Sequence, residues 1–335
     1  MPNVDLVFEG GGVKGAALVG ALAALTEAGH VAVRVAGTSA GAVLAALFVA
    51  GESPEELRDG LLAFPFTRMR DTGWEDRVPV VGPVLSVLLD QGVYEGAALE
   101  AWVRARLAAR GVRTFADVDG FEGWCRLQVV VSDVTERRLL MLPRDAHLLG
   151  VTPAELDVAL MVRASASLPF FFEPVRWRHP VTGREHVLVD GGLLSNFPVW
   201  AFDTPLVPRW PTFGLMLVEE RPRDPLGQTL PPTGARMNVF EYVRALVSTM
   251  LEAHDRRYLE TEDFVRTVAI PTLGVRTTHF DLAREEILAL FEAGRAATRS
   301  FLSGWDFDAY VRAFRVGNVP SRREMVAREL RRTRS

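Results

Sequence analysis

The sequence predicts an α/β fold, a three-layer α/β/α arrangement in which a mostly parallel central sheet lies between two layers of helices. An apolar strand-like run, a glycine-rich turn and a helical pattern follow one another twice within the first 51 residues. This alternation is typical of a parallel sheet covered by helices. The chain also has the composition of one large globular unit, with 335 residues, 48% of them hydrophobic and 24% charged.

The ends of the first two strand–helix units are well marked. We expect a strand at residues 4–8, which runs into three glycines, and a helix rich in alanine and leucine at residues 13–28. A second strand is expected at residues 31–36 and a second helix at residues 42–50, which ends at Gly51. Two consecutive strand–helix units therefore open the chain.

A third helix is predicted after Ser53, because Ser53, Pro54 and Glu56 have the pattern of a capping box with proline in the first turn. The remaining elements follow from apolar periodicity. Further strands are expected at residues 127–131, 138–142, 185–189, 213–218 and 264–270, and further helices at residues 99–109, 153–164, 239–258 and 282–301.

The chain is interpreted as one domain, residues 1–318, followed by a basic tail, residues 319–335, since six arginines fall within residues 322–335. Residues 64–96 are irregular and rich in apolar side chains, proline and glycine. Their apolar part, residues 64–89, is a candidate lid or membrane-facing surface, and the alternative is an insertion that packs on the core.

Composition excludes several classes of protein. The formal net charge of −4 offers no overall positive field for nucleic acid. Cys125 is the single cysteine, which excludes an internal disulfide and a multi-cysteine zinc site. The first residues lack a secretion signal, and every apolar stretch is shorter than the about 18–20 residues needed to cross a bilayer. We therefore expect a cytoplasmic protein that contacts membranes only peripherally.

Ser39 is the candidate nucleophile. Gly37, Thr38, Ser39, Ala40 and Gly41 match the pattern G-x-S-x-G between a predicted strand and a predicted helix, which is the context of a nucleophile elbow. Small neighbours allow the sharp turn, and the helix N-terminus favours developing negative charge.

A second glycine-rich turn follows the first predicted strand and contains Gly10, Gly11, Gly12, Val13 and Lys14. Such a turn presents several backbone N–H groups to one anionic oxygen, so it is a candidate oxyanion hole. Together with Gly15 it also fits G-x-G-x-x-G, the fingerprint of a dinucleotide site. That alternative is disfavoured, because no acidic residue stands near the end of the next predicted strand.

Asp190 stands at the end of a predicted strand and is followed by Gly191 and Gly192. The three motifs, around residues 8–15, 37–41 and 190–192, resemble in order and spacing those of the patatin-like phospholipases. The resemblance extends over roughly residues 4–302. It implies the patatin-like three-layer fold and a catalytic dyad of Ser39 with Asp190 as general base. It further implies an oxyanion hole in the first glycine-rich turn, and neither a metal ion nor an organic cofactor.

Six histidines are alternative bases for Ser39. His254 and His279 follow Asp190 in the chain, but neither stands in a glycine-rich turn after a predicted strand. His186 lies four residues before Asp190, roughly 13 Å away along a strand, and the resemblance favours a dyad without histidine.

The expected function is a serine lipid acyl hydrolase of the phospholipase A or lysophospholipase type. A general carboxylesterase or thioesterase on the same fold is the alternative, and a nucleotide-binding protein is the less favoured one. The expected partners are a phospholipid or other acyl-ester substrate, a membrane surface and an activator that gates the activity, with no nucleic acid.

Overall fold

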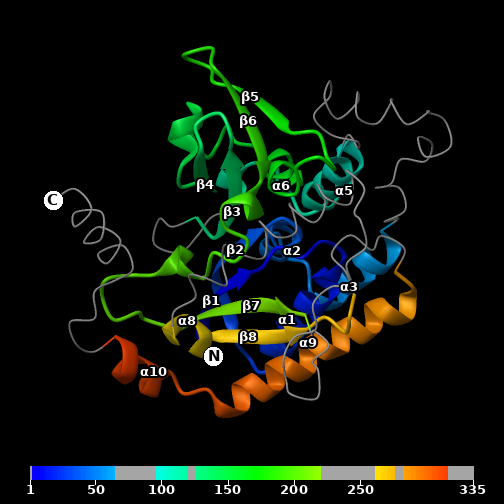
Figure 1. The fold of residues 1–335 in the computed structure, drawn as a ribbon, viewed down its shortest axis with the longest axis vertical. Coiled ribbons are helices and arrows are strands. Elements are labelled where there is room, and N and C mark those ends of the chain that lie inside the picture. Colours follow the sequence, from blue (N-terminus) through cyan, green and yellow to red (C-terminus); the bar gives the residue numbers. More distant parts are fainter. Residues whose placement is uncertain (1, 65–95, 119–124, 220–260, 276–281, 316–335) are drawn as a thin grey trace, which may run out of the picture.

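The structure is a computed structural model that describes residues 2–64, 96–118, 125–219, 261–275 and 282–315 (Figure 1). Within these residues the chain forms a central sheet with helices packed against it. The predicted α/β fold with a mostly parallel central sheet is confirmed, and five successive strands of the sheet are mutually parallel.

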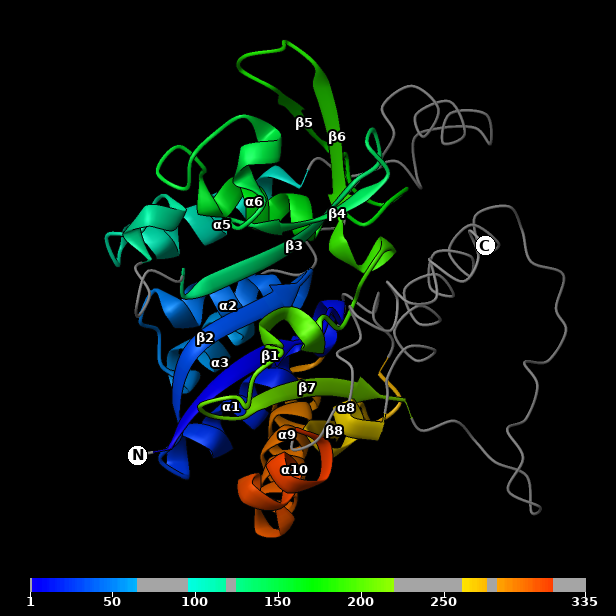
Figure 2. The ribbon, with the colours of Figure 1, turned by 90° about the vertical axis from the view of Figure 1, so that its left-hand side faces the viewer.

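The sheet of the described residues has eight strands. β3, β2, β1, β7 and β8 follow one another from top to bottom in Figure 2 and pair in parallel, whereas β4, β5 and β6 join in antiparallel fashion at the β3 side. The strands are β1 (Asn3–Phe8), β2 (Val31–Thr38), β3 (Leu127–Asp133), β4 (Arg138–Leu142), β5 (Val175–Arg178), β6 (Glu185–Asp190), β7 (Thr212–Val218) and β8 (Thr267–Pro271).

Most described helices pack on one face of this sheet. The chain moves in one direction from β1 to β2 to β3, and right-handed crossovers then place α1 and α2 on the same face. The helices are α1 (Gly15–Glu27), α2 (Ala40–Val49), α3 (Pro54–Ala63), α5 (Ala97–Ala108), α6 (Val158–Ser165), α8 (Thr261–Val265), α9 (Arg284–Gly304) and α10 (Phe307–Phe314). A smaller apolar cluster on the other face involves Phe197 and the short 3-10 helix η7 (Val199–Phe202).

Helix α1 is the centre of the core. Every residue from Gly15 to Leu25 is buried, because α1 lies between the sheet and α9, which runs along the bottom of Figure 1. The two helices approach closely at Gly20 and Gly294. A Cβ atom at Gly20 would come within 1.8 Å of the Phe291 carbonyl oxygen, and one at Gly294 within 1.9 Å of the Ala17 carbonyl oxygen.

The local predictions hold best where capping or periodicity is strong. The capping box of α3 is confirmed, since Ser53 Oγ accepts from the Glu56 N–H and Glu56 Oε2 accepts from the Ser53 N–H. The predicted helix at residues 153–164 is wrong at its start, because α6 begins at Val158. Asp157, at its N-cap, accepts from the Leu160 N–H and also pairs with Arg104 on α5, a contact that sequence does not reveal.

The predicted strand at residues 264–270 is also wrong at its start, because Phe264 lies in α8 and β8 begins at Thr267. Strand β5 and helix α10 were not expected. The predicted helix at residues 239–258, most of the candidate lid at residues 64–89 and the tail at residues 319–335 lie outside the described residues. Among the helices that are described, none is long and apolar enough to traverse a bilayer.

Candidate active site

Ser39 lies at the carboxyl end of β2 and is the N-cap residue of α2. Its backbone has φ 53° and ψ −125°, in the region that residues other than glycine rarely adopt. Its carbonyl oxygen accepts the N–H groups of Ala42 and Val43, which anchor the first turn of α2. The strand–turn–helix geometry predicted for the elbow is therefore present, and strain is retained at the candidate nucleophile.

Glycine is required on both sides of Ser39 because backbone atoms approach there. A Cβ atom at Gly37 would lie 2.3 Å from the Gly41 carbonyl oxygen. A Cβ atom at Gly41 would lie 2.5 Å from the carbonyl oxygen of Phe8. The elbow is thus packed against itself and against the end of β1, which holds the turn in one position.

Asp190 reaches Ser39 because two strands share one edge of β3. Strand β4 pairs with residues 129–133 along the other edge, so β2 and β6 must both lie on the remaining one. Thr38, the last residue of β2, pairs with Val130, and Asp190, the last residue of β6, pairs with Val131. The two strands run toward each other along this edge, so their carboxyl ends meet and bring Ser39 next to Asp190.

The Asp190 side chain is buried, with 2% of its surface exposed. Burial raises the pKa of Asp190 from 3.8 to about 7, against the lowering effect of hydrogen bonds from the Gly192 N–H and the Ser39 hydroxyl. The Gly192 N–H donates to Asp190 Oδ1 over 2.8 Å. A carboxyl with a pKa near neutrality, hydrogen-bonded to a serine hydroxyl, has the properties of a general base.

Ser165, at the end of α6, is hydrogen-bonded to the backbone of the elbow. Its Oγ accepts the Ser39 N–H at 2.9 Å and donates to the Val130 carbonyl oxygen at 2.6 Å. Two residues later, the Ser167 carbonyl oxygen accepts the Asp190 N–H at 2.9 Å. One short segment thus holds the backbone of both candidate catalytic residues.

The glycine-rich turn of residues 10–14 lies at the carboxyl end of β1 and includes the 3-10 helix η1 (Gly12–Lys14). The Gly10 N–H donates to the Asn196 carbonyl oxygen and the Lys14 N–H donates to the Gly11 carbonyl oxygen. The N–H groups of Gly11, Gly12 and Val13 have no acceptor among the described residues. A Cβ atom at Gly10 would lie 3.2 Å from Ser39 Cβ, so this turn borders the elbow directly.

Two residues of this site, Glu9 and Asn196, carry no role in the sequence-based prediction. Asn196 Nδ2 donates to the Gly10 carbonyl oxygen at 3.0 Å and to Glu9 Oε1 at 3.3 Å. The partners are 186 and 187 positions apart in the chain. Glu9 directly precedes the three glycines, which is the one sequence signal that could have indicated it.

Lys14 is buried beside the turn. Its Nζ lies 3.1 Å from Glu219 Oε1, and the two side chains are 7% and 33% exposed. Glu219 follows the carboxyl end of β7, so the ion pair joins the glycine-rich turn to a neighbouring strand. The only lysine of the chain is therefore held by a carboxylate in this structure.

Among the described residues, no histidine hydrogen-bonds to Ser39 or Asp190. His186 is buried at the start of β6, where its Nδ1 lies 2.7 Å from Asp133 Oδ2. The described histidines therefore leave the serine–aspartate pair as the candidate catalytic unit, whereas His254 and His279 lie outside the described residues.

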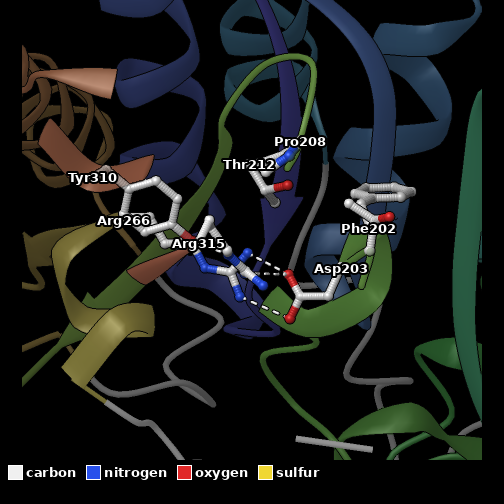
Figure 3. A pocket seen from close by; sticks show the side chains of 8 residues that line it. Phe202, Asp203, Pro208, Thr212, Arg266, Tyr310 and Arg315 are labelled. Carbon is white, nitrogen blue, oxygen red and sulfur yellow. Dashed lines mark hydrogen bonds and ion pairs between the residues drawn. The ribbon is translucent and has the colours of Figure 1, made fainter. Parts of the chain in front are cut away.

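A second polar cluster lies at the opposite edge of the sheet, near the amino ends of β7 and β8 (Figure 3). It lines a small depression at the surface. Arg266 pairs there with Asp203 and with Asp263, and Arg315 also reaches Asp203. Because this cluster pairs its own charges, it holds the chain together rather than extending the candidate active site. No three His, Cys, Asp or Glu side chains of the described residues are grouped so as to hold a metal ion.

Comparisons with known proteins identify relatives of this chain. A sequence model of the family described as patatin-like phospholipase matches residues 6–203. "Uncharacterized protein YqhO" of Bacillus subtilis is 36% identical over 310 residues, which cover 91% of this chain and 99% of that protein. Patatin-like phospholipase domain-containing protein 7 of Rattus norvegicus is 28% identical over 199 residues, 58% of this chain but 12% of the rat protein.

Among solved structures, VipD from Legionella pneumophila has a TM-score of 0.47 with 17% identity over 90% of this chain and 67% of that chain. ExoU of Pseudomonas aeruginosa, in its complex with SpcU, has a TM-score of 0.48 with 20% identity over 90% of this chain and 51% of that one. The match of the family model to more than half of the chain, together with the relative of similar length, shows that this protein belongs to the patatin-like phospholipase family.

Proposed function

We propose that this protein is a serine acyl hydrolase that releases fatty acid from a phospholipid or lysophospholipid, with Ser39 as nucleophile and Asp190 as general base. The observation that carries the proposal is the hydrogen bond between the strained Ser39 and the buried carboxyl of Asp190, whose pKa lies at about 7. A base with this pKa is half ionised at neutral pH and accepts a proton readily. Membership of the family supports a lipid ester as substrate.

In the proposed acylation step, Ser39 Oγ attacks the ester carbonyl carbon and its proton passes to the Asp190 carboxylate. The tetrahedral oxyanion accepts hydrogen bonds from the N–H groups of Gly11, Gly12 and Val13. These donors are fixed in position before the reaction, which is the condition for strong stabilisation of the transition state. When the intermediate collapses, the proton on Asp190 passes to the leaving alkoxide, and the deacylated lipid departs.

In the proposed deacylation step, a water molecule attacks the acyl-Ser39 ester and gives its proton to Asp190. A second oxyanion forms at the same donors, and its collapse releases the fatty acid while the proton returns to Ser39 Oγ. No metal ion or organic cofactor takes part in this scheme. Because the ester bonds of phospholipids lie at the bilayer surface, the proposal includes peripheral contact with a membrane. It also includes an activator that controls the hydrolytic activity.

The proposal is tested with phospholipid vesicles and a soluble short-chain ester, using the wild-type protein, Ser39→Ala and Asp190→Asn. We expect fatty acid release by the wild type and a loss of at least about 10³-fold in both variants. The kcat/KM of the wild type should rise with pH through about 7, as Asp190 ionises.

Three outcomes would change the proposal. Ester cleavage without vesicle cleavage, even with added membrane activators, favours a general carboxylesterase or thioesterase. Full activity on vesicles without any activator contradicts the proposed regulation by an activator. Activity that survives Ser39→Ala contradicts the mechanism itself.

A further inference from the structure

Asn196 connects the two halves of the candidate active site. It lies on the chain that leaves Asp190 and passes through the 3-10 helix η6 (Gly191–Leu193). Its side chain donates to the Gly10 carbonyl oxygen, and its carbonyl oxygen accepts the Gly10 N–H at 3.0 Å. The segment that carries the general base is therefore bonded on both polar atoms of Gly10, the first residue of the glycine-rich turn.

The packing around Gly10 is tight. A Cβ atom at this position would lie 2.2 Å from Asn196 Oδ1 and 3.2 Å from Ser39 Cβ. Gly10 is thus crowded by both Asn196 and Ser39, with no space for a side chain. A shift of the Asn196 side chain is expected to move the turn relative to Ser39, because closely packed atoms transmit small displacements.

Glu9 is the second hydrogen-bond partner of the Asn196 side chain. One oxygen of its carboxyl, Oε1, accepts from Asn196 Nδ2, and the other, Oε2, accepts the Leu217 N–H of β7. The Glu9 N–H in turn donates to the Leu215 carbonyl oxygen. The carboxyl therefore bridges β7 and Asn196, and it orients the Asn196 amide so that its Nδ2 faces Gly10.

We propose that Asn196 is a positioning residue which, held by Glu9, keeps the N–H groups of residues 11–13 aligned with the Ser39–Asp190 pair. It touches neither the substrate nor the reacting atoms, and it acts through Gly10. The proposal rests on the proposed function, because alignment of oxyanion donors with a nucleophile has a catalytic consequence only in acyl transfer. An amide suits this position, since it donates to both the carbonyl oxygen of Gly10 and the carboxylate of Glu9.

The first test replaces Asn196 with alanine and uses Asn3→Ala as the matched control, because Asn3 is exposed at the far end of β1. We expect kcat for a soluble short-chain ester to fall about 10- to 100-fold in Asn196→Ala, with KM within about twofold of wild type, since misplaced donors weaken only transition-state binding. The pH midpoint of kcat/KM should remain near 7, because Asn196 is not among the residues that shift the pKa of Asp190. Equal kcat in Asn196→Ala and wild type would overturn the proposal.

The second test exchanges the donor and acceptor between Glu9 and Asn196. In Asn196→Asp a carboxylate faces both the Glu9 carboxylate and the Gly10 carbonyl oxygen, so kcat should fall below that of Asn196→Ala. In the double variant Glu9→Gln with Asn196→Asp, the new amide donates to the new carboxylate while its oxygen still accepts the Leu217 N–H. We expect at least about a fivefold recovery of kcat over Asn196→Asp. A double variant no better than Asn196→Asp contradicts the pairing.

The third test does not depend on catalysis. Amide hydrogen exchange is measured at Gly10 and Lys14, whose N–H groups are bonded across and within the turn. We expect about tenfold faster exchange at both in Asn196→Ala than in wild type or Asn3→Ala. If the wild-type protein cleaves no ester, the proposed function fails, but the exchange measurement still tests the positioning role. Faster exchange in Asn196→Ala supports that role, and unchanged exchange overturns it.

Discussion

At the scale of single residues, Asp190 couples the stability of this protein to pH. The pKa of its buried carboxyl is about 7 in the folded chain, against an ordinary value of 3.8. Between these values the unfolded chain has ionised this group while the folded chain keeps it protonated. Stability is therefore lost as the pH rises from about 4 through about 7, and the loss stays constant above that range.

Replacing Asp190 with asparagine should remove this loss, since an amide keeps an acceptor for the Gly192 N–H and has no charge to bury. We expect Asp190→Asn to be more stable than wild type at pH 8, by up to about 4 kcal/mol, and equally stable near pH 4. Urea unfolding at both pH values measures the difference. If the wild type is as stable as Asp190→Asn at pH 8, or more stable, the raised pKa of Asp190 is contradicted.

Ser165 and Ser167 form a matched pair at the end of α6, both buried. Ser165 Oγ bridges the Ser39 N–H and the Val130 carbonyl oxygen, whereas Ser167 Oγ donates only to the Arg163 carbonyl oxygen one turn earlier. Ser165→Ala leaves two buried groups unpaired. We expect it to lower the free energy of unfolding by about 1–3 kcal/mol and kcat by at least tenfold.

The control Ser167→Ala should change kcat by less than about twofold, because the Ser167 carbonyl oxygen still accepts the Asp190 N–H. Thermal unfolding measures the stability of both variants, and kinetics with a short-chain ester measure their kcat. Equal effects of the two substitutions would show that Ser165 has no special part in holding the elbow.

At the scale of elements, the contact between α1 and α9 depends on two glycines. Alanine is the better helix former by about 1 kcal/mol, so a mid-helix glycine needs a reason. At Gly294 the reason is the Ala17 carbonyl oxygen, which would lie 1.9 Å from a Cβ atom at that position. Gly304 ends the same helix with open space around it.

We expect Gly294→Ala to destabilise the protein by about 1–3 kcal/mol through overpacking, because the clash is with backbone that cannot move alone. Gly304→Ala should be neutral or slightly stabilising. The urea midpoints of the two variants give the comparison directly. A gain in stability in both would mean that α9 can move away from α1 without loss.

At the scale of the whole molecule, the Arg266 cluster ties α10 to the sheet at the edge opposite the catalytic one (Figure 3). Arg266 is 2% exposed and Nη2 lies 3.0 Å from Asp203 Oδ2 and 2.6 Å from Asp263 Oδ1. Asp203, itself 25% exposed, also accepts from Arg315, which follows α10. Asp203 is thus the carboxylate shared by the residue before β8 and the residue after α10.

We expect Asp203→Ala to lower the free energy of unfolding by about 2–4 kcal/mol, since it leaves a buried guanidinium with a single carboxylate. The control Asp308→Ala removes an exposed carboxylate from the first turn of α10 and should lower stability by less than about 1 kcal/mol. Urea unfolding followed by tryptophan fluorescence is suitable, because Trp305 packs against Tyr310 of α10. Equal urea midpoints for Asp203→Ala and Asp308→Ala would show that the Arg266 cluster contributes little to stability.

Features that depend on neighbouring residues could be predicted from the amino-acid sequence. The elbow around Ser39 follows from glycines two positions away on each side, and the capping box of α3 follows from Ser53 and Glu56. Alternation of strands and helices predicted the parallel sheet, since each unit carries its own periodicity. The dyad itself was implied by resemblance, not by any local rule.

Contacts between distant segments became visible in the folded chain alone. Ser39 and Asp190 meet because β2 and β6 share one edge of β3, a register that neither strand encodes alone. Asn196 and Gly10 are 186 positions apart, and Asp157 at the N-cap of α6 pairs with Arg104, 53 positions away. Hydrogen bonds and packing of this kind depend on distances in space, whereas propensity and periodicity report only on distances along the chain.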